Sequence, residues 1–213
     1  MRFSTLFAGI FLTFALAWFG ETVIPNIQLG NLQPQTDEDG GDIYPVDNSG
    51  IAARGRKVYV AEGCFYCHTQ QVRGGQAGSD IDRGWGKRQT VARDYIYTDP
   101  VVLGLTRNGP DLANEGTQQI DGKPIDAAWH YAHLYNPRSK VEGSFMPSFS
   151  YLFEPKKIVG QRSEDALKLE GVYAPANGYE VVPTSDAKAL VAYLMSLDRS
   201  HALKEVKQEA PAK

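Results

Sequence analysis

Two cysteines and a histidine lie together in the segment Cys64-Phe-Tyr-Cys-His68, and these are the only cysteines among 213 residues. A C-x-x-C spacing followed at once by histidine is the attachment signature of c-type haem. Two thiols about one helical turn apart can reach both vinyl groups of a porphyrin, and the adjacent imidazole can then bind the iron. Cys64 and Cys67 are therefore predicted to hold one covalent haem c, with His68 as an axial ligand.

Two other chemistries use the same residue types. A thioredoxin-like dithiol also has the C-x-x-C spacing, but it needs a strand leading into the motif, and a helical pattern precedes Cys64. A zinc knuckle would need two more ligands at metal spacing, and the remaining histidines are His130, His133 and His201. Haem is the interpretation that accounts for both cysteines and the histidine.

An iron bound by one histidine has a sixth position, for which Met146 is the leading candidate. It lies in the loop Gly143-Ser-Phe-Met-Pro147, about 80 residues after the motif, where a proline stiffens the chain. His/Met ligation raises the reduction potential, and an iron with both positions filled transfers electrons without binding substrate. The alternatives are Met195, which we expect to fill the core from the last helix, and the three remaining histidines, of which His130 and His133 more simply form a polar helix face.

Three further residues are candidates for contacts with the haem. Pro110, in Asn108-Gly-Pro-Asp-Leu112, has a carbonyl that could accept a hydrogen bond from the second ring nitrogen of His68. Leu112 could then pack on the ring. Arg138 could pair with a haem propionate or a partner protein, although an ordinary surface salt bridge is an equal alternative.

The N-terminal segment predicts a membrane anchor. Residues 3–20 contain no charged side chain, and about 22 apolar residues make roughly 33 Å of helix, enough to cross the hydrocarbon core. A cleaved signal peptide is the alternative, since Ala15-Leu-Ala17 resembles a cleavage site, but bulky Trp18 follows it directly. We expect residues 1–24 to be retained, with Arg2 in the cytoplasm and the acidic run at 37–39 outside.

The remaining chain predicts one folded domain. Residues 25–50 form a Pro/Gly-rich extended linker, residues 51–200 the domain, and residues 201–213 a charged tail that we expect to be loose. Long polar excursions cover 74–108 and 152–182. A net charge of −3 excludes nucleic acid as the expected partner, because binding phosphate backbones requires a basic face.

Helical patterns bracket the candidate site, and strands should be few. A helix begins near Ile51, and a short one covers 126–135 with Asp126 as its cap. An amphipathic helix follows, capped by Ser185 or Asp186, and its apolar stripe consists of Leu190, Val191, Leu194 and Leu197. Gly55 would let the first helix cross closely against the last one at Leu190, Tyr193 and Leu194. The predicted fold class is mainly α: one transmembrane helix and a class I-like helical cytochrome c domain with long loops.

Five segments follow one another along the chain: the anchor, Glu62-Gly-Cys-Phe-Tyr-Cys-His68, Asn108–Leu112, Trp129-His-Tyr-Ala-His-Leu-Tyr-Asn-Pro-Arg138 and Phe145-Met-Pro-Ser-Phe149. Together they resemble the membrane-anchored mono-haem cytochrome c subunit of cbb3-type cytochrome c oxidases. The resemblance runs from the anchor through about Phe153 and again over the last helix. It implies that Cys64, Cys67, His68 and Met146 bind haem c in a non-catalytic electron-transfer subunit.

The resemblance also implies partners and a location. The chain would pass electrons to a large haem–copper subunit that reduces oxygen to water and pumps protons, alongside further cytochrome c subunits. It would sit in the bacterial inner membrane as a single-pass protein in contact with lipid, with its domain on the periplasmic side. The segment Gln71-Val-Arg-Gly-Gly75 departs from the apolar-Arg-Pro-Phe run common in the family, and the 152–182 excursion looks individual to this chain. The small subunit of nitric oxide reductase, another anchored mono-haem cytochrome c and, less favoured, a thiol–disulfide oxidoreductase are the alternative functions.

Overall fold

The computed structural model describes residues 2–36 and 41–209; the acidic run at 37–39 lies outside them. These residues divide into two compact units. The first holds the residues up to 46 together with 91–99, and the second holds 47–90 and the residues from 100 onward. The predicted haem motif and the other candidate site residues all belong to the second unit.

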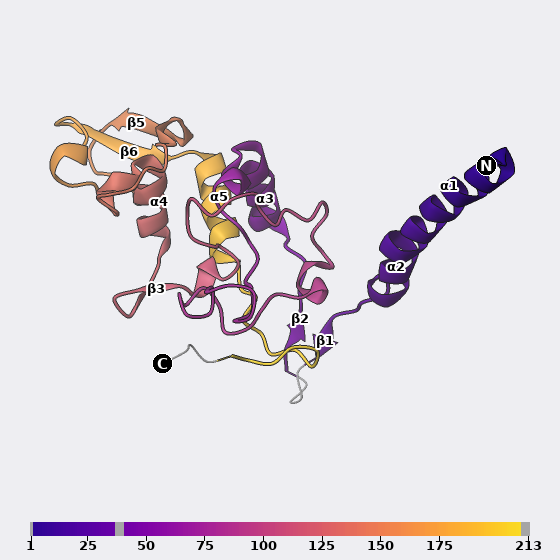
Figure 1. The fold of residues 1–213 in the computed structure, drawn as a ribbon. Helices are drawn as coiled ribbons and strands as arrows, with labels where there is room; N and C mark the ends of the chain where they lie inside the picture. Colours follow the sequence, from indigo (N-terminus) through magenta and orange to yellow (C-terminus); the bar gives the residue numbers. More distant parts are fainter. Residues whose placement is uncertain (1, 37–40, 210–213) are drawn as a thin grey trace. The chain divides into compact units, whose positions relative to one another are not determined.

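A long apolar helix dominates the first unit (Figure 1). Helix α1, Phe3–Trp18, continues through a π-helical turn, Phe19–Val23, into α2, Ile24–Leu29. The helix therefore extends five residues beyond the expected anchor boundary, and the π turn comes just before Pro25, which cannot donate a helical hydrogen bond. Over Phe3–Leu29 the helix is long and apolar enough to cross a membrane, and its side chains are not buried within the chain.

The expected linker is partly ordered. Strands β1, Gln35–Thr36, and β2, Ile43–Tyr44, pair antiparallel. The Tyr44 hydroxyl donates a hydrogen bond of 2.8 Å to the Asp94 carboxylate, in the 3₁₀ turn Ala92–Tyr95. Part of the predicted excursion at 74–108 thus packs with the linker through a buried tyrosine.

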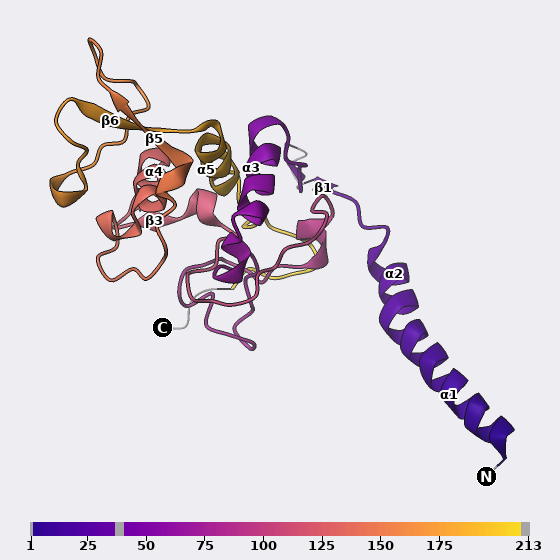
Figure 2. The ribbon, with the colours of Figure 1, turned by 90° about the horizontal axis from the view of Figure 1, so that it is seen from above.

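Helices α3, Gly50–Ala61, and α5, Ser185–Met195, lie side by side in the second unit (Figures 1 and 2). They meet at Gly55, where an added Cβ would come within 1.8 Å of the Ala189 carbonyl oxygen and 2.7 Å of the Tyr193 Cβ. Next to this crossing, the rings of Tyr59 and Tyr193 pack with centroids 5.5 Å apart. The close helix crossing expected at Gly55 is confirmed.

The predicted apolar stripe of α5 is confirmed, but two details of this helix differ. Leu190, Val191, Leu194 and Leu197 are all buried. The cap is Thr184, whose hydroxyl accepts from the Ala187 N–H at 3.3 Å, and not Ser185 or Asp186. Met195 is 43% exposed, so the expectation that it fills the core was wrong. It lies at the last position of the helix, off the buried stripe.

Helix α4, Ala127–Tyr135, has the predicted bounds and the predicted cap, because the Asp126 carboxylate accepts from the Trp129 N–H at 2.8 Å. Within the described part of this unit the strands are short antiparallel pairs: β3, Gln119–Ile120, with β4, Lys123–Pro124, and β5, Phe153–Lys157, with β6, Tyr179–Pro183. Single turns of 3₁₀ helix cover Cys64–Tyr66, Glu115–Thr117, Pro137–Ser139, Ser150–Leu152 and Gly171–Tyr173.

The β5–β6 hairpin was not predicted from the sequence. It closes the excursion at 152–182, with Phe153 opposite Pro183 and Lys157 opposite Tyr179. Phe153 and Val181 are buried in the same apolar cluster as α3 and α5. The ends of this excursion therefore belong to the core, while its middle remains largely exposed.

The C-terminal tail, expected to be loose, packs against the loop at 74–90 as far as it is described. Leu203 is buried. The Glu209 N–H donates to the Lys87 carbonyl at 2.7 Å, and the Glu209 carboxylate accepts from the Gly75 N–H at 3.0 Å. The buried Arg88 side chain donates to the His201 carbonyl at 2.6 Å. These contacts give ordered partners to a loop with little apolar content of its own.

Candidate haem site

The Cys-x-x-Cys-His motif lies at the C-terminal end of α3. Gly63 ends the helix in the left-handed conformation, with φ +69°, which costs glycine least. The turn Cys64–Tyr66 follows, and the N–H groups of Cys67 and His68 both donate to the Cys64 carbonyl, at 3.2 and 3.0 Å. This places the two thiols one turn apart, with the histidine immediately after them.

Neither cysteine is in a disulfide. Cys64 is half-buried against the apolar core, and Cys67 is exposed. Burial raises the pKa of the Cys64 thiol to about 12. Reactive dithiols have a lowered thiol pKa at the start of a helix, whereas this pair follows the end of one. The arrangement therefore disfavours the thioredoxin-like alternative.

The His68 ring is held by the turn at Asn108–Leu112. Its Nδ1 lies 2.9 Å from the Pro110 carbonyl oxygen, so the expected hydrogen bond is present. The ring lies against Gly109, where an added Cβ would come within 2.2 Å of the His68 Cε1. Burial lowers the pKa of His68. With Nδ1–H donating to Pro110, the neutral ring keeps Nε2 as a free lone pair, which is the form that binds a metal.

Two backbone hydrogen bonds fix this turn beside the motif. Gly109 donates to the Cys67 carbonyl at 2.9 Å, and Leu112 donates to the Thr69 carbonyl at 2.8 Å. A Cβ at Gly109 would have to enter the space of the imidazole, so glycine is required by the close approach of the two segments. Leu112 is buried in the same cluster that Cys64 contacts.

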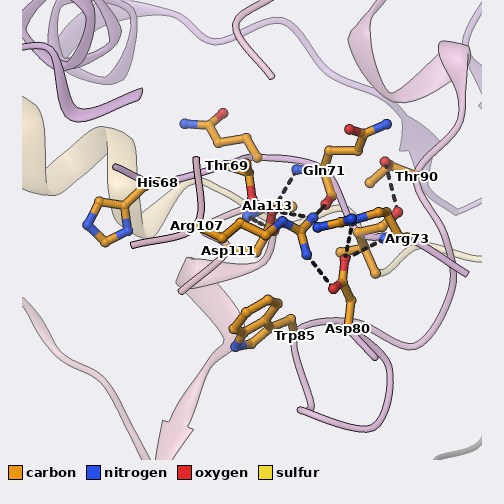
Figure 3. Close-up of polar contacts among 12 residues, drawn as sticks. His68, Thr69, Gln71, Arg73, Asp80, Trp85, Thr90, Arg107, Asp111 and Ala113 are labelled. Carbon is orange, nitrogen blue, oxygen red and sulfur yellow. Dashed lines mark hydrogen bonds and ion pairs between the residues drawn. The ribbon is translucent and has the colours of Figure 1, made fainter. Parts of the chain in front are cut away.

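A buried charge network lies next to this turn (Figure 3). One Asp111 carboxylate oxygen accepts from the Thr69 hydroxyl at 2.5 Å and from the Gln71 N–H at 2.8 Å, and the other accepts from the Ala113 N–H at 2.8 Å. Arg107 lies 3.8 Å from Asp111 and also pairs with Asp80. Figure 3 shows His68 on one side of the network and Asp80 on the other.

This network was not predicted from the sequence. Asp80 lies in an earlier loop than Arg107 and Asp111, which are four residues apart, and in the sequence each of the three resembles an ordinary charged surface residue. The one available signal was Asp111 itself, as part of the Asn-Gly-Pro-Asp-Leu motif. The Arg107 guanidinium also lies over the Trp85 ring, with its carbon atom 5.4 Å from the ring centroid.

Met146 lies in the loop between the turns at 137–139 and 150–152. It is half-buried and packs against the same apolar cluster as Cys64 and Leu112, while its neighbour Phe145 is 72% exposed. Two contacts hold the loop to α4: Phe149 N–H donates to the Leu134 carbonyl at 2.9 Å, and the Ser148 hydroxyl donates to the Tyr135 carbonyl at 2.5 Å. The structure thus brings Cys64, Leu112 and Met146 to one cluster.

Arg138 is exposed, in the turn Pro137–Ser139 that follows α4. Its backbone N–H donates to the Asn136 side chain at 3.2 Å. The contact of its guanidinium with a haem propionate or a partner stays a prediction.

The two histidines of α4 are held as neutral rings. His130 is buried, with Nε2 3.9 Å from a Glu115 carboxylate oxygen, and His133 stacks on Trp129 with centroids 4.7 Å apart. Burial lowers the pKa of each ring to about 4, and burial raises the pKa of Glu115 to about 7. Between these values the imidazole of His130 and the carboxyl of Glu115 are both neutral, so they do not form an ion pair there.

These residues fit a haem better than a metal ion. The site offers two unpaired thiols one turn apart, an imidazole with its Nδ1 committed to Pro110, and a thioether on the same apolar cluster. In residues 2–36 and 41–209, no group of three or more His, Cys, Asp or Glu side chains is placed to hold a metal ion directly. The zinc alternative therefore lacks its ligands within this part of the chain.

Comparison with known protein families identifies the class of protein to which the chain belongs. Residues 44–180 match the family described as cytochrome C oxidase, mono-heme subunit/FixO. The match covers more than half of the chain, which therefore belongs to this family, the mono-haem subunits of cbb3-type cytochrome c oxidases. No curated protein matches the chain. Family membership implies a haem, a role in electron transport and a cytochrome oxidase complex.

The matched range differs from the resemblance seen in the sequence. It extends to residue 180, so it includes most of the excursion at 152–182 that looked individual to this chain, and it leaves out the N-terminal helix and α5.

Proposed function

We propose that the chain carries one haem c, bound covalently through Cys64 and Cys67, with His68 and Met146 as axial ligands. When bound, the haem supplies a one-electron couple, and the subunit passes electrons toward the haem–copper subunit that reduces oxygen and pumps protons. The observation that carries the proposal is the 2.9 Å hydrogen bond from the ring Nδ1 of His68, in the Cys-x-x-Cys-His motif, to the Pro110 carbonyl.

The chain's own residues would perform three tasks. The thiols of Cys64 and Cys67 fix the ring to the end of α3, and Pro110 fixes the plane and tautomer of His68. The apolar cluster with Leu112 excludes water, which favours ferrous iron and a higher potential. The Met146 loop, tied to α4, brings a thioether to the same cluster.

The arrangement supports a class I-like cytochrome c domain. The motif follows α3, helices α3 and α5 cross at Gly55, and a Gly-Pro turn holds the histidine. The haem would also complete an otherwise small core, so folding should depend on it.

The N-terminal helix supports a single-pass anchor in the bacterial inner membrane. The charge of Arg2 before the helix favours a cytoplasmic N-terminus, which would place the haem domain on the periplasmic side. A subunit held there could receive electrons from an outer donor, directly or through further cytochrome c subunits, and deliver them to the catalytic subunit.

Affinity purification of the tagged full-length chain in mild detergent tests this function. We expect a co-purifying large subunit that contains b-type haem and copper, and stopped-flow reduction in which haem c is reduced before the b-type haem. A copper-free complex that reduces nitric oxide would instead assign the chain to a nitric oxide reductase. Recovery of a chain without haem but with thiol–disulfide exchange activity would contradict both assignments.

A further inference from the structure

The Asp111 carboxylate joins the two segments that hold His68. It accepts from the hydroxyl of Thr69, the residue after the histidine, and from the backbone N–H groups of Gln71 and Ala113, at 2.5, 2.8 and 2.8 Å. The Asp111 side chain has no exposed surface. Three such hydrogen bonds to one buried carboxylate hold the Pro110 carbonyl, one residue earlier, at a fixed place relative to the imidazole.

A second buried carboxylate lies on the other side of Arg107. Asp80, whose side chain is 3% exposed, pairs with Arg107 and accepts from the Arg73 N–H at 2.7 Å. Arg107 also donates to the Gln71 carbonyl at 2.6 Å. Asp80 and Asp111 therefore share burial and a cationic partner. The hydrogen bonds of Asp111 join the segment that follows His68 to the segment of Pro110, whereas Asp80 accepts from the Arg73 N–H.

On the basis of the proposed function, we propose that Asp111 is a positioning residue that sets the reduction potential of the haem iron through His68. The carboxylate orients the Pro110 carbonyl, and a well-placed acceptor at Nδ1 makes the imidazole a stronger donor to iron. The negative charge of Asp111 also interacts electrostatically with the imidazole. Both effects stabilise ferric iron, so both lower the potential.

Two substitutions in the full-length chain, purified with its complex, separate this role from an effect of overall charge. Asp111→Asn removes the charge and replaces one acceptor oxygen with a donor. We expect it to raise the reduction potential of haem c by at least about 59 mV, which for one electron is a tenfold change in the electron-exchange equilibrium. Asp80→Asn removes the same charge from the same arginine at nearly equal burial, and we expect less than a third of that shift.

A third variant addresses geometry alone. Thr69→Val keeps the charge of Asp111 and removes one hydrogen bond that ties residue 69 to residue 111. It should raise the potential by less than Asp111→Asn does, with haem content unchanged. If Asp111→Asn does not accumulate with haem, Thr69→Val tests the proposal instead. A wild-type potential in Thr69→Val then overturns the proposal.

Equal shifts in the two aspartate variants would also overturn it, because the effect would then be one of overall charge. So would a wild-type potential in Asp111→Asn. These failures are distinct from failure of the proposed function, which would show as absence of covalent haem in the wild-type chain.

Discussion

Replacing Gly109 by alanine should disturb the His68 ring directly. An added Cβ would lie 2.2 Å from Cε1, 2.7 Å from Nδ1 and 2.8 Å from Nε2 of that ring. Carbon atoms pack comfortably at about 3.5 Å, so the ring or the turn must move by roughly 1.3 Å. The backbone of Gly109 is not in the left-handed region, so the expected damage comes from this contact and not from a strained φ.

The energetic cost follows from two effects. Overpacking of a well-filled site costs roughly 1–3 kcal/mol, and loss of the His68–Pro110 hydrogen bond costs about 1 kcal/mol. Together they predict that Gly109→Ala destabilises the domain by about 2–4 kcal/mol. The weaker donor at iron should also raise the potential.

Guanidinium unfolding of the haem-loaded full-length chain in detergent, followed at the Soret band, measures the first effect, and a redox titration measures the second. Gly143→Ala is the matched control, because Gly143 lies in the Met146 loop, has no positive φ, and has nothing within 4 Å of an added Cβ. The control should stay within about 0.5 kcal/mol of wild type. If Gly109→Ala matches the control in both measurements, the ring does not lie against Gly109 and the reasoning fails.

Three further predictions concern other parts of the site. Gly55→Ala should destabilise the domain by at least about 2 kcal/mol in the same unfolding measurement. The new Cβ would lie 1.8 Å from a backbone oxygen, while the better helix propensity of alanine returns only about 1 kcal/mol. Unchanged stability would refute the close crossing. Because burial raises the pKa of Glu115 from 4.5 to about 7, the folded state binds the extra proton between these values and loses stability as pH rises through them. Glu115→Gln should therefore match wild type near pH 4.5 and be more stable at pH 8, by up to roughly 3 kcal/mol; an equal gain at both pH values would contradict a raised pKa. Met146→His should abolish the near-infrared sulfur-to-iron band and lower the reduction potential by roughly 60 mV or more. Met195→Leu, at an exposed position, should leave both the band and the potential unchanged. The reverse result would assign the ligand to Met195.

Local signals in the sequence were sufficient for the helices and their crossing. Asp126 caps α4 because a carboxylate after a loop can accept from the third N–H of the helix, which requires no knowledge of the rest of the chain. Gly55 predicted the contact with α5 because a missing side chain on a buried helix face permits close approach. The hydrogen bond between His68 and Pro110 could be predicted because both residues belong to recognisable motifs.

Contacts between distant loops could not be predicted in this way. Asp80, Arg107 and Asp111 form one network only after the chain has folded, and each alone resembles a solvated charge. The β5–β6 hairpin was missed because its strands lack regular alternation and lie 21 residues apart, between Lys157 and Tyr179. The tail looked loose from its charge, but Leu203 and the Glu209 hydrogen bonds join it to the loop at 74–90.

Covalent attachment of haem to the full-length chain is the most direct test of the account. The wild-type protein should give a pyridine haemochrome spectrum of haem c at one haem per chain, should keep that haem through acid–acetone extraction, and should have no thiol available at Cys64 or Cys67 for alkylation. Extraction of all the haem, or two free thiols in the purified chain, would contradict the central claim.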